Sequence, residues 1–407
     1  MVTNRLLPSY LLAILVHLGN GLAISFLSVY LHTINISFTN IGMIYAVGAV
    51  LGGFAHIPLG NWLDRHGRKA MLLCGLLGYG AYAFGLALAT STVHFIFLGI
   101  ILELVGAIFW TALYAHMFDL MSYDHVGEQL GKRNAILFAI GAFAPFIAGF
   151  LITKIGYINL FYLSALICLA GLPIVFFAIT DAKVKKTKDN LLEEYQKLSN
   201  VKGFNAILAL LFVHTLIWGV WYIYMPVYLA SQGMTTSMIG LIIFSYWMVS
   251  AATQYHMGKL MDRVPAKWII VPALLFVWVG GVLFTRISGF MSALVNRSIM
   301  SFGFDASWWP AITELSRILP RQFHGAGFAL QAGAAAIAFA VASVLGGIFA
   351  DLFGILPVLI FASWLALIVA LVVWPTKQFE EILNHHKHKM HLEAHKHIHG
   401  LKTHGRR

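Results

Sequence analysis

The strongest constraint on this chain is a series of long apolar runs, each about as long as the roughly twenty residues that a helix needs to cross a bilayer. We count twelve runs in two groups of six. They lie near 8–31, 38–59, 70–90, 93–117, 134–153 and 158–180, then 204–230, 237–258, 268–285, 290–312, 326–349 and 355–374. With 59% hydrophobic and 11% charged residues, the chain has too much apolar surface for a soluble fold. The sequence therefore predicts an all-α membrane protein with twelve transmembrane helices.

The basic residues lie mostly on one side of these predicted spans. The connections at 32–37, 89–93 and 231–237 contain no Lys, Arg, Asp or Glu. Those on the other side hold Arg65, Arg68, Lys69, Lys132, Arg133, Lys259, Arg263, Lys267, Arg317 and Arg321, and only Lys154 and Arg286 break the pattern. The positive-inside rule then places this side and both termini in the cytoplasm of a multi-pass cell-membrane protein. Topology accounts for the net charge of +11, so we expect no nucleic-acid partner.

A charged stretch divides the chain into two similar parts. We predict a six-helix half at 1–180, a cytoplasmic linker at 181–203, a second six-helix half at 204–375 and a His-rich basic cytoplasmic tail at 376–407. Matches recur at one offset of 198: Gly60, Asp64, Arg65 and Lys69 with Gly258, Asp262, Arg263 and Lys267; Ile41 and Gly42 with Ile239 and Gly240; Gly149 and Gly156 with Gly347 and Gly354. A constant offset indicates a duplicated unit, as in transporters with two repeats around a midplane site.

One segment carries a family resemblance. Residues 60–69, GNWLDRHGRK between the second and third spans, resemble the signature loop of the major facilitator superfamily, and 258–267 resemble its shortened second copy. The resemblance covers the chain from the first span to the last. It implies two pseudo-symmetric six-helix halves, a transporter rather than an enzyme, and no cofactor. It also implies a conformational latch at Gly60, Asp64, Arg65, Gly67, Arg68, Lys69, Asp119, Gly258, Asp262 and Arg263. The alternative is that these charges only set the topology.

A second resemblance lies in the fifth span. Drug/proton antiporters of this superfamily carry Gly-Pro-x-x-Gly-Gly there, and this chain has Ala144, Pro145, Ala148 and Gly149 at the matching positions. Two glycines of the pattern are alanines in this chain. Small residues also allow close packing of any two membrane helices, so ordinary packing is an equal alternative.

Ionisable residues inside the spans are the main candidates for chemistry, because a charge near the bilayer centre is costly. They are His17, Glu103, His214, Arg297 and Asp305, in the spans at 8–31, 93–117, 204–230 and 290–312. In the resembled fold these four helices line the central cavity. The spacing of Arg297 and Asp305 also puts them on one helix face with Ser301.

Glu103 is the first candidate for proton coupling, since a carboxyl group in a partly dry cavity can load and unload a proton. The alternatives are Asp305, His17 and His214 as the proton carrier, or a structural ion pair of Glu103 with Arg297 or a histidine. The substrate-cavity candidates share an aromatic or polar side chain on the same helices: Asn20, Trp110, Trp218, Trp221, Tyr222, Arg297, Ser301 and Trp308. Aromatic rings beside carboxylates suit a lipophilic or cationic substrate.

These features favour a secondary active transporter that couples efflux of small lipophilic or cationic compounds to protons by alternating access. No Gly-x-x-x-x-Gly-Lys-Ser/Thr motif is present, so a gradient should supply the energy. One alternative is proton-coupled uptake of a polar organic solute such as a sugar, amino acid or organic acid. Another is a non-transporting sensor whose tail binds metal, since His391 and His395 stand at i, i+4. A solvated basic tail is favoured, so we predict no metal site. The expected partners are a small-molecule substrate, protons and lipid, and the expected state is a monomer.

Overall fold

The computed structural model describes residues 6–120, 126–179, 197–261, 263–320 and 323–375 of the chain, without the side chains of 56–66, 118–120, 126–135, 255, 258–259 and 324–325. The long elements of this part are all helices. They are α1 (Leu7–Ile24), α2 (Leu27–Thr33), α3 (Phe38–His66), α4 (Arg68–Leu88), α5 (Thr92–Leu120), α6 (Val126–Leu169), α7 (Leu172–Ala178), α9 (Phe204–Ser231), α10 (Thr236–Met261), α11 (Lys267–Leu283), α12 (Phe290–Ile318), α13 (His324–Phe353) and α14 (Ile355–Val373).

The twelve predicted spans are present, although two need comment. Ten helical stretches of the described chain are long and apolar enough to cross a membrane, and Ile136–Ala178 among them contains two predicted spans. Gly156, with φ of 78°, separates these two, in a conformation that glycine adopts without steric cost. The span missing from the ten is α12, which carries the polar Asn296, Arg297 and Asp305. The all-α membrane fold is therefore confirmed.

The structure shifts two boundaries at the predicted latch. Residues 60–66 continue α3 instead of forming a loop, and the turn to α4 consists of Gly67 with φ of 78°. Asp119 belongs to α5 rather than lying beyond it. Helices extend further here because a membrane helix does not stop where the apolar run ends, and charged residues near its end can lie among headgroups.

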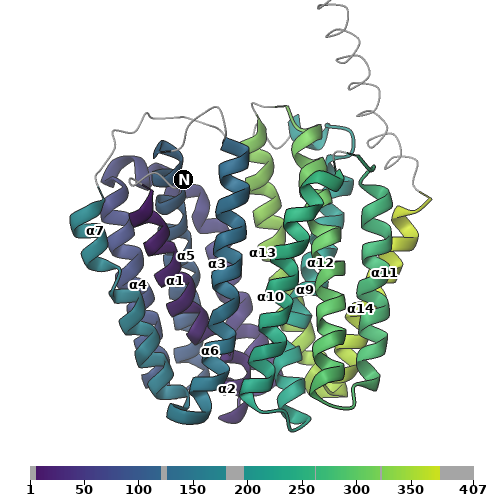
Figure 1. Ribbon diagram of the computed structural model, residues 1–407, viewed down its shortest axis with the longest axis horizontal. Coiled ribbons are helices and arrows are strands. Elements are labelled where there is room, and N and C mark those ends of the chain that lie inside the picture. Colours follow the sequence, from purple (N-terminus) through teal and green to yellow (C-terminus); the bar gives the residue numbers. More distant parts are fainter. Residues whose placement is uncertain (1–5, 121–125, 180–196, 262, 321–322, 376–407) are drawn as a thin grey trace, which may run out of the picture.

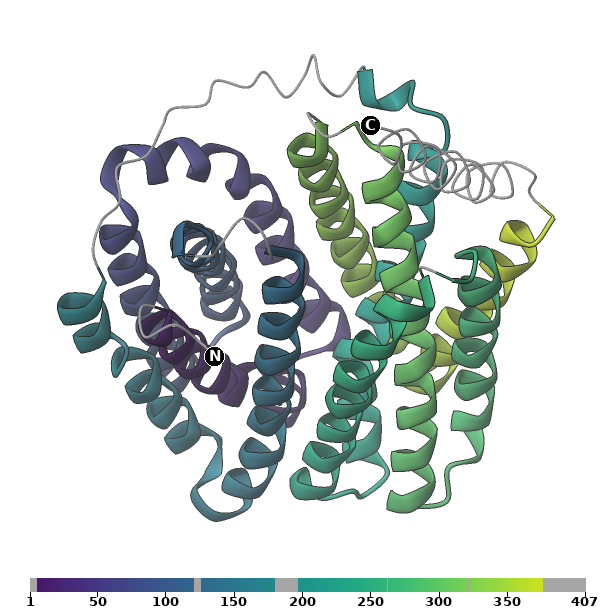
Figure 2. The same cartoon turned by 45° about the horizontal axis from the view of Figure 1, so that its top comes forward.

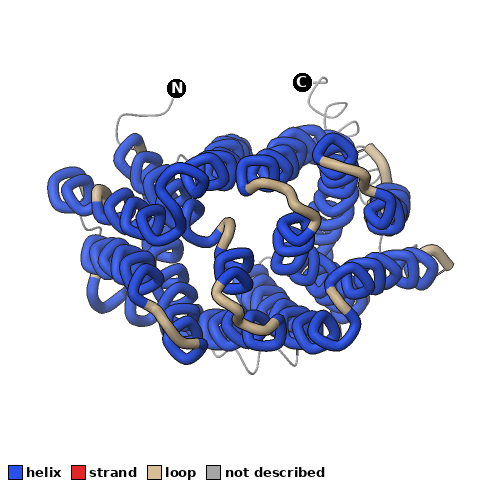
Figure 3. The backbone as a smooth tube through the Cα atoms, turned by 90° about the horizontal axis from the view of Figure 1, so that it is seen from below, coloured by secondary structure: helices blue, strands red, loops and turns tan. Residues whose placement is uncertain are grey.

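The two groups of helices lie side by side. Figure 1 shows α1 and α3 to α7 on one side of the molecule and α9 to α14 on the other, and Figure 2 shows the same division from a tilted view. The main contacts between the groups join α3 to α13 and α6 to α10. Figure 3 shows the helices nearly end-on, packed side by side. This arrangement places α1, α5, α9 and α12 where they can face one another.

The contacts between the groups repeat with the sequence. A Cβ atom at Gly42 of α3 would collide with the carbonyl oxygen of Ser343, and one at Gly240 of α10 would collide with that of Pro145. Ser343 and Pro145 are themselves 198 residues apart, as are the two glycines. The α3–α13 and α6–α10 interfaces are therefore two copies of one close helix packing, which needs a residue without a side chain.

A second pair of glycines extends this packing. A Cβ atom at Gly149 of α6 would meet the carbonyl of Thr236, and one at Gly347 of α13 would meet that of Phe38. Thr236 and Phe38 are the first residues of α10 and α3. All these contacts lie toward the end of the bundle where α2 is found, at the bottom of Figure 1, which we call the α2 end. The two groups of helices are thus packed tightly there.

Candidate functional site

A central chamber of about 330 Å³ lies between the two groups of helices. Its polar lining includes His17 and Asn20 of α1 and Arg297 of α12. Its aromatic lining includes Trp110 of α5 and Tyr222 of α9. The structure therefore brings together, from both groups, residues that the sequence marked separately.

Glu103 lines a second chamber of about 370 Å³, between α3, α5, α9 and α13. The surrounding side chains include Tyr45, Tyr82 and Tyr222. Gly52 of α3 makes room for the acid, since a Cβ atom there would lie 2.5 Å from the Cβ of Glu103. The described residues form no ion pair with Glu103, neither Arg297 nor a histidine, and no hydrogen bond to its carboxyl group is present among them. The ion-pair alternative is therefore not realised in this structure.

Asp305 lines a third chamber, of about 330 Å³, together with His214, Trp308 and Gln254. Trp309 Nε1 donates a hydrogen bond to Asp305 Oδ1 at 3.3 Å. His214 Nε2 lies 3.0 Å from the carbonyl oxygen of Phe304, and it can donate there only if that nitrogen carries the proton. His214 thus links α9 to α12, which is a structural role for an intramembrane histidine.

Aromatic rings lie at the boundaries between the three chambers, where one ring lines more than one chamber. Trp218 lines all of them, and it stacks on Tyr222 with centroids 4.8 Å apart. Its Nε1 also donates to the Tyr246 hydroxyl at 3.0 Å. Tyr45 and Tyr222 belong to both the central chamber and the Glu103 chamber. We call Tyr45, Trp218 and Tyr222 the aromatic waist, because these three rings lie where the two chambers meet.

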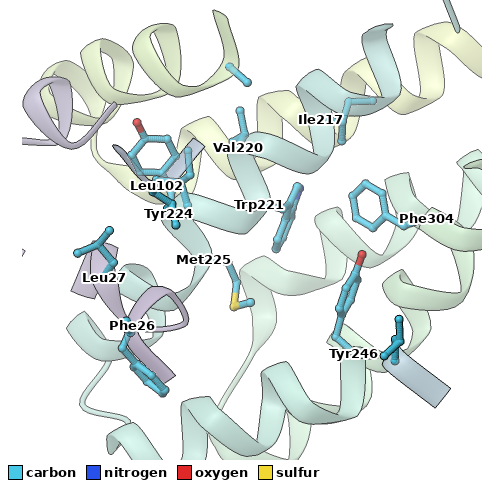
Figure 4. Close-up of a cluster of buried hydrophobic side chains, with 14 of the residues drawn as sticks. Phe26, Leu27, Leu102, Ile217, Val220, Trp221, Tyr224, Met225, Tyr246 and Phe304 are labelled. Atoms are coloured by element: carbon cyan, nitrogen blue, oxygen red, sulfur yellow. The ribbon is translucent and has the colours of Figure 1, made fainter. Parts of the chain in front are cut away.

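Arg297 is held among three aromatic rings. Its guanidinium carbon lies 4.2 Å from the ring centroid of Tyr246, 5.6 Å from that of Phe304 and 5.7 Å from that of Trp221. Figure 4 shows these three labelled rings gathered around one space. The residue is 3% exposed, and none of the described residues forms a hydrogen bond with its Nε or Nη1. Cation–π contact stabilises the charge without satisfying its N–H groups.

Two predicted cavity residues do not line a chamber. The Trp221 ring is fully buried, with Nε1 donating to Ser363 Oγ at 3.2 Å, and it contributes to the site only through Arg297. Ser301 Oγ donates to the Tyr246 carbonyl oxygen at 2.7 Å. Both point from their helices toward neighbouring helices, which the spacing along a single helix could not reveal.

Two histidine–tryptophan contacts repeat across the molecule. The rings of His17 and Trp110 have centroids 4.6 Å apart, and those of His214 and Trp308 lie 5.1 Å apart. Trp110 and Trp308 are separated by 198 residues, so a comparison of the two halves of the sequence at this offset would have paired the two tryptophans.

Sequence reasoning missed Tyr45, Tyr82 and Tyr246, which come from α3, α4 and α10 rather than from the four expected helices. For Tyr246, the nearby polar Ser245, Ser250 and Gln254 in an apolar span were an available signal.

The fifth-span motif contributes to packing and to the chamber wall. Pro145 lines the central chamber, while Gly149 packs against α10. Ala144 lies against Gly21 of α1, and Ala148 is fully buried. Small residues are needed at these positions because helices approach from two sides.

Most of the predicted latch lies outside the described residues. This applies to the side chains of Asp64, Arg65 and Asp119, to those around Gly60 and Gly258, and to Asp262. Arg68 is buried, Arg263 is exposed, and Lys69 Nζ donates to the Phe176 carbonyl oxygen of α7 at 2.7 Å. The latch therefore stays a prediction.

The His-rich tail at 376–407 also lies outside the description. In the part of the chain that the structure describes, no group of three or more His, Cys, Asp or Glu could hold a metal ion.

Comparison with known proteins decides the family. The model of the Major Facilitator Superfamily matches residues 9–294 and 207–396. The chain belongs to the Major Facilitator Superfamily. It is 22% identical over 362 residues to the MFS-type transporter MJ1560 of Methanocaldococcus jannaschii, covering 87% of this chain and 93% of that protein. It is 26% identical over 308 residues to Multidrug resistance protein 2 of Bacillus subtilis, covering 71% and 74%.

The fold agrees with this membership. The crystal structure of the nucleoside transporter NupG superposes with a TM-score of 0.75 at 11% identity, covering 91% of this chain and 98% of NupG. At that identity the likeness concerns the fold alone. The protein is a multi-pass membrane transporter of a small molecule, and no enzymatic activity is indicated.

Proposed function

We propose that this transporter couples the export of small lipophilic cations to an opposing movement of protons, by alternating access around the joined chambers. The observation that carries the proposal is Glu103, an acid on an aromatic chamber wall without an ion pair or hydrogen bond from the described residues. A carboxylate in such a place can hold either a proton or a cationic substrate, but not both. Competition for one acid is the simplest coupling of an antiporter.

The aromatic lining supports a lipophilic cation as the substrate. Tyr45, Tyr82 and Tyr222 line the same chamber as the acid, and aromatic ring faces attract cations. The chamber volumes of about 330 and 370 Å³ fall within the range of roughly 300 to 1,000 Å³ that is usual for drug-sized ligands. The similarity to a multidrug resistance protein is consistent with this substrate class.

The two-group architecture supports alternating access. The groups meet at the repeat-related interfaces of α3 with α13 and α6 with α10, and superfamily-like repeats rock against each other around a midplane site. In our account the packed α2 end faces the outside of the cell, as the positive-inside rule predicts. Opening that end would expose Glu103 to the compartment from which protons enter.

Proton-driven transport in liposomes tests the proposal. Liposomes with an acidic lumen and the purified protein should accumulate ethidium, and Glu103→Gln should lose this accumulation. Glu314→Gln is the matched control, because Glu314 pairs with Arg317 at 2.7 Å outside the three chambers and glutamine can keep a hydrogen bond there.

Unchanged proton-driven accumulation in Glu103→Gln would refute the role of Glu103. If Asp305→Asn loses proton-driven accumulation while Glu103→Gln keeps it, Asp305 is the proton carrier. A wild-type protein that ignores ethidium but moves sugars, amino acids or organic acids with protons would support uptake of a polar solute instead.

A further inference from the structure

The central chamber contains a cation that has no counter-ion in the described part of the chain. Arg297 is 3% exposed and lies about two turns from the start of α12, and its Nε and Nη1 have no hydrogen-bond partner among the residues that the structure describes. Three rings face it, but a guanidinium carries five N–H donors that rings cannot satisfy as a carboxylate can. A buried charge without a partner is strongly unfavourable. An acceptor from outside the protein would remove that cost.

The acids of the described chain do not fill this role. Asp305 stands eight residues further along α12, roughly 12 Å along the helix axis, and it lines another chamber. Glu103 lines the chamber beyond the aromatic waist. Neither makes an ion pair with Arg297 in the part of the chain that the structure describes. The open side of Arg297 is the central chamber itself.

The two chambers therefore carry opposite charges on either side of one ring cluster. Arg297 lines the central chamber, Glu103 lines its neighbour, and the aromatic waist of Tyr45, Trp218 and Tyr222 belongs to both. An elongated compound could place an aromatic body against the waist and a charged group at each end. The electrostatic match requires a cation toward Glu103 and an anion toward Arg297.

We propose that Arg297 binds a carboxylate of the transported compound, so that the preferred substrates are aromatic zwitterions rather than simple cations. This inference rests on the proposed function, which supplies the cationic end at Glu103. A carboxylate can accept two parallel hydrogen bonds from the guanidinium fork, which a lysine could not provide. The rings of Tyr246, which also lines the chamber, and of Phe304 contact the guanidinium and help to fix its position.

Matched probes test the carboxylate subsite. We would use 6-(aminoalkoxy)-2-naphthoates of increasing alkyl length and the corresponding carboxamides, which keep the ring and the amine but lose the acid. Calorimetric titration of the purified protein should give, at the best length, about tenfold or tighter binding of the naphthoate than of its carboxamide. In Arg297→Gln the ratio should fall to about one, with carboxamide affinity within about twofold of wild type.

Several results would overturn the subsite. If the wild-type protein binds the naphthoate and the carboxamide with equal affinity at every alkyl length, the subsite is refuted, and no variant is needed for this conclusion. A parallel loss of both probes in Arg297→Lys would point to a structural role, because our account predicts an intermediate preference for the naphthoate in that variant. If Arg297→Gln does not fold, the titrations of the wild-type protein and of Arg297→Lys still test whether Arg297 binds the carboxylate.

The same probes separate this inference from the proposed function. If a pH gradient drives accumulation of the cationic carboxamide while the naphthoate has no advantage, the Arg297 subsite is refuted and the antiport mechanism stands. If the naphthoate advantage depends on Arg297 but no probe responds to a pH gradient, the subsite stands and the antiport mechanism is refuted.

Discussion

The α3–α13 and α6–α10 interfaces share one close helix packing but differ in their polar contacts. Both retain glycines that face a carbonyl of the other group. At the first interface, Asp351 of α13 accepts hydrogen bonds from the backbone N–H groups of Phe38 and Thr39 at 2.9 and 2.8 Å, and from the Thr39 hydroxyl at 2.6 Å. An acid there satisfies the unpaired N–H groups at the start of α3 and interacts favourably with its dipole.

The second interface has only hydroxyl groups in the corresponding place. Thr236 and Ser237 donate to the Gly149 carbonyl oxygen at 2.8 and 3.2 Å. The position that corresponds to Asp351 is Thr153, 198 residues earlier, whose hydroxyl bonds within its own helix to Phe150. Duplication thus preserved the packing, while the charged contact exists on one side. We infer that packing holds the α2 end closed and that the charge makes the two sides unequal.

Filling the glycine contacts should have the largest effect. Gly42→Leu and Gly240→Leu would each push a side chain into a backbone carbonyl of the opposite group, and overpacking costs about 1 to 3 kcal/mol. The ratio of the closed to the open form at the α2 end should fall roughly ten- to hundredfold, equally in both variants. Spin-label distances between Ile34→Cys and Gln232→Cys, in a background without the native cysteines, measure this population.

The control for that experiment is Gly333→Leu, because nothing lies within 4 Å of a Cβ atom at this glycine of α13. It should leave the distance distribution unchanged. A wild-type distribution in Gly42→Leu would contradict the assignment of these contacts as the closing element, and a large difference between Gly42→Leu and Gly240→Leu would contradict their equivalence.

Removing the charge should have an intermediate effect on one interface only. Asp351→Asn keeps one acceptor oxygen but loses the other oxygen and the charge at the start of α3, and the weaker hydrogen bonds with the lost dipole interaction should cost about 0.5 to 2 kcal/mol. The same spin labels should report a smaller shift toward the open form. Thr153→Val, the repeat-related control, should report none, and an equal shift in both variants would show that the charge is irrelevant.

The smallest effect is expected from the hydroxyl groups. Thr236→Val removes one of the two hydroxyl donors to the half-buried Gly149 carbonyl oxygen, while Ser237 still donates to it, so the cost should lie near the lower end of about 0.5 to 1.5 kcal/mol. The shift should be below that of Asp351→Asn. Should the hydroxyl variant open the α2 end more than Asp351→Asn does, the ranking of the two interfaces would be reversed.

The sequence predicted the parts of the molecule that follow from periodicity and duplication. Apolar length gave the twelve spans, and the offset of 198 gave equivalent positions in both groups, including Gly42 with Gly240. Intramembrane charges such as Glu103 and Arg297 marked chambers because burying them without a purpose is costly.

Contacts between helices could not be predicted in the same way. The position of Tyr246 against Arg297 and the burial of Trp221 behind the chamber wall depend on how α9, α10 and α12 are rotated about their axes. A single sequence gives the faces of each helix but not the partner of each face. The cap by Asp351 joins residues 313 positions apart, which no local pattern encodes.

The most direct test of the central claim is whether substrate binding removes a proton from Glu103. Infrared difference spectra of the protein in lipid, recorded on adding ethidium, would follow the C=O stretch of protonated carboxyl groups. We predict that ethidium removes one such band and releases a proton to the medium, and that Glu103→Gln lacks both signals. A carboxyl band that does not change when ethidium binds, or one that changes equally in Glu103→Gln, would contradict the exchange of proton and cation at this acid.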